Sequence, residues 1–375
     1  MKETPHPSRS ASHLLPQGEK ALCRRTLLAA PFVAGALAAC DRFATAEPAP
    51  VATPPLKSVA PFPVGSAVMS GQLDDPAWVA LARREVNQLT PEWEMKMEYI
   101  LRSPDRLTFD APDRIAEACR ASGARLHGHA LIWYSQGEQA FAGFDRTHFP
   151  RAFDRYIAEV AGRYRGRVVS WDVVNEPVAE DGNGLRDSHW SRALGPDGYM
   201  IRAFEQAKLA DPEAVLFLND YNLENNPAKG ATFLRTVERL LKAGAPIGGL
   251  GTQSHLDIEI PAGQITSLIR ELGGFGLPVH VSELDASLRR EGMGDLRSRS
   301  QRQEQQHGRV IELAEAFMAL PARQRFAFTA WGLRDSDSWL RRGDRDDGRD
   351  QPLLFDDAGQ AKPLTAALAG VFGRG

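Results

Sequence analysis

The chain has 375 residues, of which 43% are hydrophobic and 25% are charged, so it is long enough to bury one large core or two smaller ones. Its 45 basic and 48 acidic residues leave a formal net charge of −3. This near balance, with no basic patch and no phosphate-binding loop in the sequence, argues against a nucleic-acid or phosphate partner and is compatible with a neutral ligand.

Residues 1–46 have the features of an export signal. Arg24 and Arg25 precede an apolar run that is too short for a permanent membrane helix, and the two arginines resemble a twin-arginine signal. The run leads to Cys40, which resembles the lipidated cysteine of a bacterial lipobox, whereas residues 44–46 offer a rival cleavage site. We therefore expect an exported protein that is periplasmic, secreted or anchored to a membrane through a lipid on Cys40.

A linker is predicted over residues 47–60, which begin with a segment rich in proline and alanine. One folded domain is predicted over residues 61–375. Cys119 is the only cysteine of that domain, so we expect no disulfide within it and interpret Cys119 as a small buried residue of a helix.

Short apolar runs alternate with helical patterns along this domain, which favours βα units around a parallel sheet. Strands are predicted over residues 63–68, 85–89, 124–132, 168–174, 215–219, 247–253, 279–283 and 326–331. Helices are predicted, among other segments, over residues 112–122, 150–164, 227–243 and 297–318. Eight such strands, with no GxGxxG motif after the first, favour a (β/α)8 TIM barrel over a doubly wound sheet.

Two glutamates follow buried strands in the same way. Glu176 follows the apolar run 168–174 and precedes Pro177, which cannot continue a strand ladder. Glu283 is the last residue of the run 279–283. The C-terminal ends of barrel strands meet at one face, so the pair offers two carboxylates for acid and nucleophile chemistry. The alternative is that each glutamate merely caps a strand.

The segment 341–350 mixes arginine, aspartate and glycine after the last predicted strand. We interpret it as a solvated loop, and simple exposure is favoured over a direct role in substrate binding.

Six motifs, in order along the chain, resemble glycoside hydrolase family 10, the retaining endo-β-1,4-xylanases. They are residues 126–136, 171–177, 219–222, 251–255, 281–285 and 331–339. The resemblance runs from about residue 61 to the C-terminus and implies a polysaccharide substrate, xylan or xylo-oligosaccharides. It also implies a monomer.

The resemblance implies that Glu176 is the general acid/base and Glu283 the nucleophile. The negative charge of Glu283 raises the pKa of Glu176, and esterification of Glu283 to the sugar removes that charge, so that Glu176 can then act as a base on water. Asn175 matches a residue that hydrogen-bonds the sugar 2-hydroxyl, and His255 matches one that orients the nucleophile, with Asp285 also in a supporting role. No metal and no cofactor is needed for this cycle.

The resemblance also implies residues that contact the donor sugar, on the glycone side of the bond that is cut. Carboxylate, amide and ammonium groups suit sugar hydroxyls, and aromatic rings suit the C–H faces of the sugar. For Trp133 and Trp339, packing in the core is the alternative. The residues are Glu92, Lys96, His129, Trp133, Tyr134, Gln253, Trp331 and Trp339.

Four positions depart from the family pattern. Trp93 stands where the family usually has Asn, Met97 where it has Trp, His127 where it has Arg, and Tyr134 where it has His. An indole at position 93 removes an amide partner of a sugar hydroxyl and either blocks a distal sugar or stacks on it. The departures concern chain-length preference and the identity of the sugar, while the catalytic pair is intact.

The leading hypothesis is therefore retaining endo-hydrolysis of β-1,4-xylosidic bonds. Two alternatives are a related β-1,4-glycanase that acts on cellulose or mixed oligosaccharides, and a barrel that binds oligosaccharides without turning them over.

Overall fold

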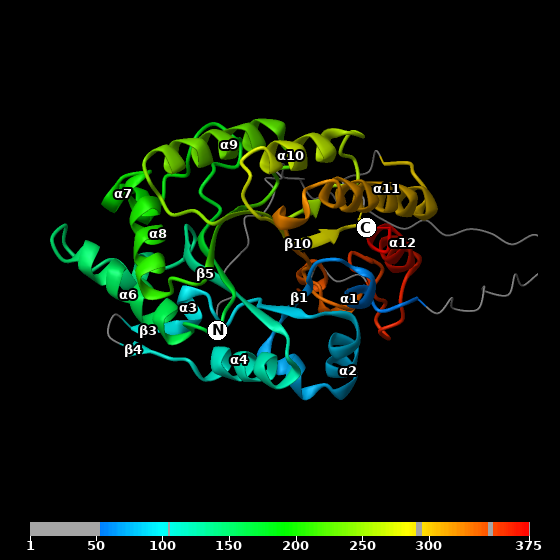
Figure 1. The fold of residues 1–375 in the computed structure, drawn as a ribbon, viewed down its shortest axis with the longest axis horizontal. Helices are drawn as coiled ribbons and strands as arrows, with labels where there is room; N and C mark the ends of the chain where they lie inside the picture. The colour runs from blue at the N-terminus through cyan, green and yellow to red at the C-terminus, as the bar shows by residue number, and fades with distance from the viewer. Residues whose placement is uncertain (1–52, 104–105, 290–294, 344–347, 375) are drawn as a thin grey trace, which may run out of the picture. The chain divides into compact units, whose positions relative to one another are not determined.

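Eight parallel strands form a closed ring, and helices surround it (Figure 1). The computed structural model describes residues 53–103, 106–289, 295–343 and 348–374. The predicted export signal, Cys40 and the first part of the predicted linker lie outside the described residues. In the described part, no helix combines the length and the apolar character needed to cross a membrane.

The strand order around the ring is β11, β1, β2, β5, β6, β7, β8 and β10, and pairing of β10 with β11 closes it. The strands are β1 (Val64–Val68), β2 (Gln88–Pro91), β5 (Arg125–Trp133), β6 (Ser170–Asn175), β7 (Val215–Asp220), β8 (Gly249–Thr252), β10 (Val279–Ala286) and β11 (Arg325–Ala330). All eight predicted strands are present, and the largest shifts of their ends are at Gln88 and Ala286. The predicted (β/α)8 TIM barrel is confirmed.

Helices and short elements connect these strands. The longer helices are α2 (Pro76–Glu85), α4 (Asp110–Ser122), α6 (Phe149–Arg163), α8 (Gly198–Ala210), α9 (Pro227–Lys242), α10 (Gln264–Gly273), α11 (Arg299–Met318) and α12 (Pro363–Phe372). The shorter helices are α1 (Leu56–Val59), α3 (Met97–Ile100), α5 (Glu138–Phe141), α7 (His189–Leu194), η1 (Ser70–Asp74), η2 (Ala322–Gln324), η3 (Asp335–Asp337) and η4 (Trp339–Arg341). A hairpin of β3 (Leu101–Ser103) and β4 (Arg106–Leu107) follows α3, and β9 (His255–Leu256) pairs with the end of β10.

Capping residues explain where several helices begin and end. The side chain of Asn226 accepts hydrogen bonds from the first turn of α9, and Ser298 forms a capping box at the start of α11. Gly123 adopts the left-handed conformation that ends α4. The four helices predicted by name correspond to α4, α6, α9 and α11, and Cys119 is buried on α4 as expected.

Residues 56–59 were assigned to the linker, but they form α1, which packs against α12. Leu56 is buried, and its N–H donates to the Glu85 carboxylate at 3.0 Å. Nearby, Phe62 packs edge-to-face on Phe317 and Phe372, with ring centroids 5.0 Å apart in both pairs. The folded body therefore begins before residue 61, because apolar side chains in this short segment find partners on helices from the other end of the chain.

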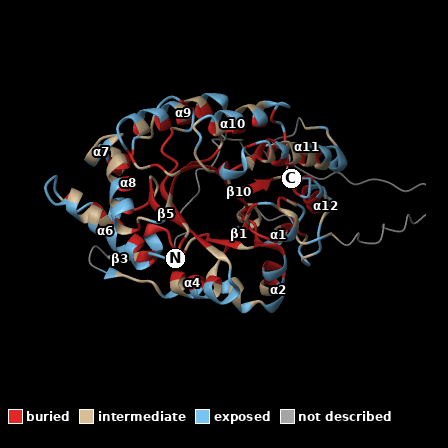
Figure 2. Ribbon diagram, viewed as in Figure 1, coloured by how far each residue is buried: buried red, intermediate tan, exposed pale blue. Residues whose placement is uncertain are grey.

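Burial is concentrated in the strands and on the helix faces turned toward them (Figure 2). At some positions, two neighbouring strands fit together because one of them carries a glycine, which has no side chain. Gly128 on β5 is the register partner of Trp171 on β6, and a Cβ at Gly128 would lie 2.2 Å from the indole of Trp171.

This close contact gives a test of the fold. Gly128→Ala is expected to lower the free energy of unfolding by about 1–3 kcal/mol, because the added methyl group overpacks the interface between β5 and β6. Gly162→Ala is the matched control, since Gly162 is exposed on α6 with no atom within 4 Å of an added Cβ; it is expected to raise stability by about 0.5–1 kcal/mol. Urea unfolding measures both, and a Gly128→Ala midpoint at or above that of the wild type contradicts the prediction.

Candidate active site

Glu176 follows β6 in an unusual backbone conformation. Its φ is 58°, in the left-handed region that residues other than glycine rarely adopt. The N–H of Glu176 donates to the carbonyl of Asn219 at 2.8 Å, and Nε of Arg186 donates to the carbonyl of Glu176 at 3.1 Å. Both bonds hold the backbone in a conformation that would otherwise be disfavoured.

The carboxylate of Glu176 is buried among three N–H donors. Nε1 of Trp133 donates to Oε2 at 2.8 Å, while Nε2 of Gln253 and Nδ2 of Asn175 donate to Oε1 at 3.0 and 3.1 Å. These donors come from the C-terminal ends of β5, β8 and β6. The orientation of the carboxylate is therefore fixed from three sides.

Glu283 lies on β10 and reaches the same site. Nδ2 of Asn219 donates to Oε1 of Glu283 at 3.0 Å and also to Oδ1 of Asn175 at 3.0 Å. Because Asn175 in turn donates to Glu176, two amides connect the carboxylates of Glu176 and Glu283. The structure thus brings the two predicted catalytic residues together at one end of the barrel.

His255 stands beside Glu283 and contacts a second carboxylate. Its Nε2 lies 3.5 Å from Oε2 of Glu283, and its Nδ1 lies 2.9 Å from Oδ2 of Asp285. Nε1 of Trp339 donates to the same Asp285 oxygen at 2.8 Å. Burial disfavours a charged imidazole, but Asp285 and Glu283 outweigh it and raise the pKa of His255 to about 10. At neutral pH, therefore, His255 places a positive charge next to Glu283.

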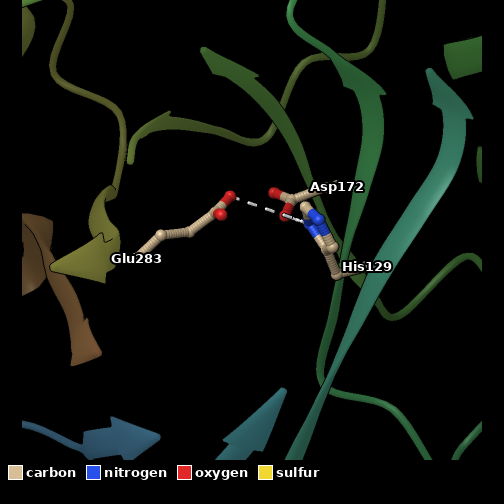
Figure 3. Close-up of side chains that lie close together, drawn as sticks. All are labelled: His129, Asp172 and Glu283. Carbon is tan, nitrogen blue, oxygen red and sulfur yellow. Dashed lines mark hydrogen bonds and ion pairs between the residues drawn. The ribbon is translucent and has the colours of Figure 1, made fainter. Parts of the chain in front are cut away.

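His129 contacts Asp172 and lies near Glu283. Its Nδ1 is 2.7 Å from Oδ2 of Asp172 and 4.0 Å from Oε1 of Glu283, and Figure 3 shows Glu283 extending toward this pair. His127 contacts the same Asp172 oxygen through Nε2 at 2.9 Å. Burial opposes ionisation of Asp172, but the two histidines hold its pKa far below the usual range.

The atoms of His129, Asp172 and Glu283 that could bind a metal ion lie within 4.8 Å of one another. The 2.7 Å contact between His129 and Asp172 has the length of a charge-assisted hydrogen bond, and Oδ2 of Asp172 already has two imidazole partners. Catalysis without a metal stays a prediction.

Lys96 lies among tryptophan rings. Its Nζ is 4.5 Å from the ring centroid of Trp93, 4.8 Å from that of Trp133 and 6.0 Å from that of Trp331. Burial lowers the pKa of Lys96, while Glu283, Glu92 and Glu176 act in the opposite direction. Lys96 thus interacts electrostatically with all three of these carboxylates.

Glu92 pairs with an arginine from the loop after β11. Nη1 and Nη2 of Arg342 donate to the two oxygens of Glu92 at 2.6 and 2.7 Å. The expectation of a simply solvated loop over residues 341–350 is wrong for part of it, since the Arg341 side chain is only 8% exposed and Asp350 is 2% exposed. The reason is that these charged groups find partners elsewhere in the fold: Arg341 donates to Asp357, and Asp350 accepts from Ser287 and Leu288, which follow β10.

The four departures from the family pattern fall in different surroundings. Trp93 is half-buried beside Lys96 and Tyr99, whereas Met97 is buried in the core. His127 lies inside the barrel, and Tyr134 lies under the guanidinium of Arg186, whose Cζ is 4.1 Å from the ring centroid. Burial and the nearby Glu176 raise the pKa of Tyr134, so its hydroxyl stays protonated.

Sequence reasoning missed three residues of this site: Asn219, Asp172 and Arg342. Asn219 and Asp172 belonged to recognised motifs but received no role. A signal was present for both, because each is a polar residue within an apolar strand. Nothing in the sequence near Arg342 distinguishes it from the other charged residues of its loop.

Comparison with known proteins gives consistent results. The sequence profile of Glycosyl hydrolase family 10 matches residues 56–371. Endo-1,4-beta-xylanase A of Cellvibrio japonicus is 34% identical over 348 residues, which are 84% of this chain and 56% of that protein. Exoglucanase XynX of Acetivibrio thermocellus is 32% identical over 325 residues, which are 82% of this chain and 28% of that protein. The chain thus spans between 28% and 56% of the length of these two relatives.

A solved structure with the same fold is a mutant of xylanase10C from Cellvibrio japonicus in complex with xylopentaose. Its TM-score is 0.79 at 27% identity, and the match covers 86% of this chain and 70% of that one. The family match over residues 56–371, together with these likenesses in sequence and structure, shows that the chain belongs to glycosyl hydrolase family 10.

Proposed function

We propose that this protein hydrolyses β-1,4-xylosidic bonds within xylan, with retention of configuration. The observation that carries the proposal is the pair of carboxylates joined by amides: Asn219 donates to Glu283 and to Asn175, and Asn175 donates to Glu176. Two buried carboxylates held toward each other at the C-terminal end of a barrel suit a double displacement on a glycosidic bond.

In the first step, Glu283 attacks the anomeric carbon while Glu176 gives its proton to the leaving oxygen. The His255 imidazole and the Asn219 amide contact the carboxylate of Glu283 and orient it for attack. The bond to the leaving sugar breaks as the ester to Glu283 forms.

In the second step, water replaces the departed sugar. Esterified Glu283 no longer carries a negative charge, so Glu176 takes a proton from water, and the hydroxide releases the sugar from Glu283. Glu176 and Glu283 return to their starting protonation states, and no further reactant is consumed.

Groups around the pair suit a sugar ring. Nδ1 of His129 is held by Asp172, which leaves Nε2 for a sugar hydroxyl. Trp133 and Trp339 use their indole N–H groups on Glu176 and Asp285, so their ring faces can pack against sugar C–H groups without an unpaired polar atom. The other polar and aromatic groups expected to contact the sugar belong to Asn175, Gln253, Lys96 and Trp331.

A second candidate is hydrolysis of a β-1,4-glucan. It is favoured by Trp93 in place of the family Asn, and by the likeness to a protein named Exoglucanase. Initial rates of reducing-sugar release from xylan and from a soluble cellulose discriminate the two, and we expect the rate on xylan to be the greater. An equal or greater rate on the cellulose would contradict the assignment of xylan as the substrate.

The N-terminal sequence supports export, with Cys40 as the lipid acceptor or residues 44–46 as the cleavage site. We propose that the protein acts outside the cytoplasm as a monomer. Its polymeric substrate is consistent with that location.

Removal of the nucleophile tests the mechanism. Glu283→Ala is expected to reduce kcat on xylan by at least about 10³-fold, because no covalent intermediate can form. Quenching of tryptophan fluorescence by xylo-oligosaccharides should still report binding. Glu315→Gln, which changes an exposed carboxylate on α11, is the control and should leave kcat unchanged. Wild-type protein that binds the sugars without turnover would instead identify a binding barrel.

The raised pKa of His255 predicts a dependence of stability on pH. The imidazole pKa rises from its ordinary 6.5 to about 10 in the folded protein, so its stabilising contribution is complete below about pH 6.5 and is lost as the pH rises through about 10. We expect urea midpoints of the wild type to exceed those of His255→Gln by a larger margin at low pH than at high pH.

The exposed His148, whose Nδ1 lies 2.9 Å from the nearby Asp145, provides the control variant His148→Gln. Its effect on the urea midpoint should be small, because exposed pairs contribute little to stability. Parallel stability curves for the wild type and His255→Gln would contradict the assignment of a protonated His255.

A further inference from the structure

We propose that Arg342 determines specificity on the glycone side of the site, by closing it with Glu92 so that the chain of sugars on that side stays short. This inference rests on the proposed function and concerns which bonds of a xylan chain are cut.

The contact between Arg342 and Glu92 is a two-pronged ion pair. Both terminal nitrogens of the guanidinium donate to Glu92, and Nη2 also donates to the carbonyl of Asp337 at 3.0 Å. Asp337 is held by Arg334, which donates to it from its backbone N–H at 2.9 Å and from its side chain. Arg342 is therefore fixed in position by three bonds, which distinguishes it from a mobile surface arginine.

The burial of these groups places the ion pair at the outer end of the site. The Glu92 side chain is 5% exposed, whereas the Arg342 side chain is 33% exposed. Lys96 is buried and interacts electrostatically with Glu92 as well as with Glu283 and Glu176. Lys96 and Glu92 are thus buried near Glu176 and Glu283, and Arg342 is the member of this group that reaches solvent.

Aromatic side chains form the adjoining part of this end. The Trp93 ring lies 4.5 Å from Nζ of Lys96 and 5.9 Å from the Tyr99 ring. Tyr99 is exposed, and it is close enough to Arg342 to interact with its charge. An indole at position 93 fills more space than the shorter amide of the family pattern, and Tyr99 lies near both Trp93 and Arg342.

The ion pair also changes what Glu92 can offer to a sugar. Both carboxylate oxygens already accept charge-assisted hydrogen bonds, which are stronger than bonds from a neutral hydroxyl. A sugar that reaches Glu92 has to use the remaining lone pairs, and a chain that continues past it has to displace Arg342. Sugars beyond Glu92 therefore contribute little binding energy in the wild type.

Arg341 offers a matched control on the same loop. It pairs with Asp357 at 2.6 Å rather than with Glu92, so Arg341→Ala also removes one arginine–carboxylate pair. Arg342→Lys keeps the positive charge of Arg342 but loses its planar fork, and it serves as a second, milder variant if Arg342→Ala lowers stability.

The experiment measures which bond is cut in reducing-end-labelled xylo-oligosaccharides from xylotriose to xylohexaose. In Arg342→Ala the preferred bond should move toward the reducing end, and kcat/KM for xylohexaose should rise by about three- to tenfold, the contribution of one net hydrogen bond. Arg342→Lys should shift the pattern in the same direction by less, and Arg341→Ala should keep the wild-type pattern.

Hydrolysis of an aryl β-xylobioside by the wild type tests the proposed function separately, because this substrate carries only two sugars on the glycone side. A folded wild type without this activity would contradict the proposed function and not the role of Arg342. Unchanged cleavage positions and an unchanged dependence of kcat/KM on chain length in folded Arg342→Ala would overturn the role of Arg342. An equal shift in Arg341→Ala would overturn it as well.

Discussion

Glu176 and Glu283 share one buried site. The amides of Asn175 and Asn219 connect the two carboxylates, and the imidazole of His255 offsets part of their negative charge. An unpaired buried charge is costly, and Glu176 and Glu283 together would repel each other. Asn219 donates to Glu283 and accepts from Ser282 through Oδ1 at 2.9 Å, so its amide is satisfied on both sides. The arrangement depends on strand register, since Asn219 lies opposite Gly251, and a Cβ at Gly251 would be 2.3 Å from Oδ1 of Asn219.

Other carboxylates near the site follow the same rule of pairing across elements. Asp172 on β6 binds His127 and His129 of β5, Asp285 on β10 binds His255 of β9, and Glu92 binds Arg342. Each pair joins two segments that the barrel brings together. The network therefore supports the relative position of the strand ends as well as the charge state of each group. Removal of one member takes a charge-assisted partner away from a buried carboxylate.

The sequence was most informative where a single strand could be recognised from its own residues. Apolar runs that stop at Glu176 and Glu283 predicted both the barrel strands and the meeting of these two carboxylates, because strand ends of a barrel converge on one face. The partners of Glu92 and the packing of Leu56 were not predictable in this way. Arg342 is 250 residues from Glu92 along the chain, and α1 is stabilised by helices at the opposite end, so only the folded structure brings them together.

Left-handed backbone recurs where three neighbouring strands end, at Glu176, Asn222 and Ser254, with φ between 56° and 58°. Each of these backbone conformations costs about 1–3 kcal/mol of free energy relative to a glycine or a relaxed turn. Hydrogen bonds offset this cost at each position: Arg186 donates to the Glu176 carbonyl, the N–H of Asn226 donates to the Asn222 carbonyl at 2.9 Å, and the Ser254 hydroxyl donates to a carboxylate oxygen of Glu224 at 2.6 Å. A glycine at position 176 would relieve the backbone but remove the carboxylate. In the proposed mechanism, the requirement for an acid at this position keeps a residue that stability alone would not select.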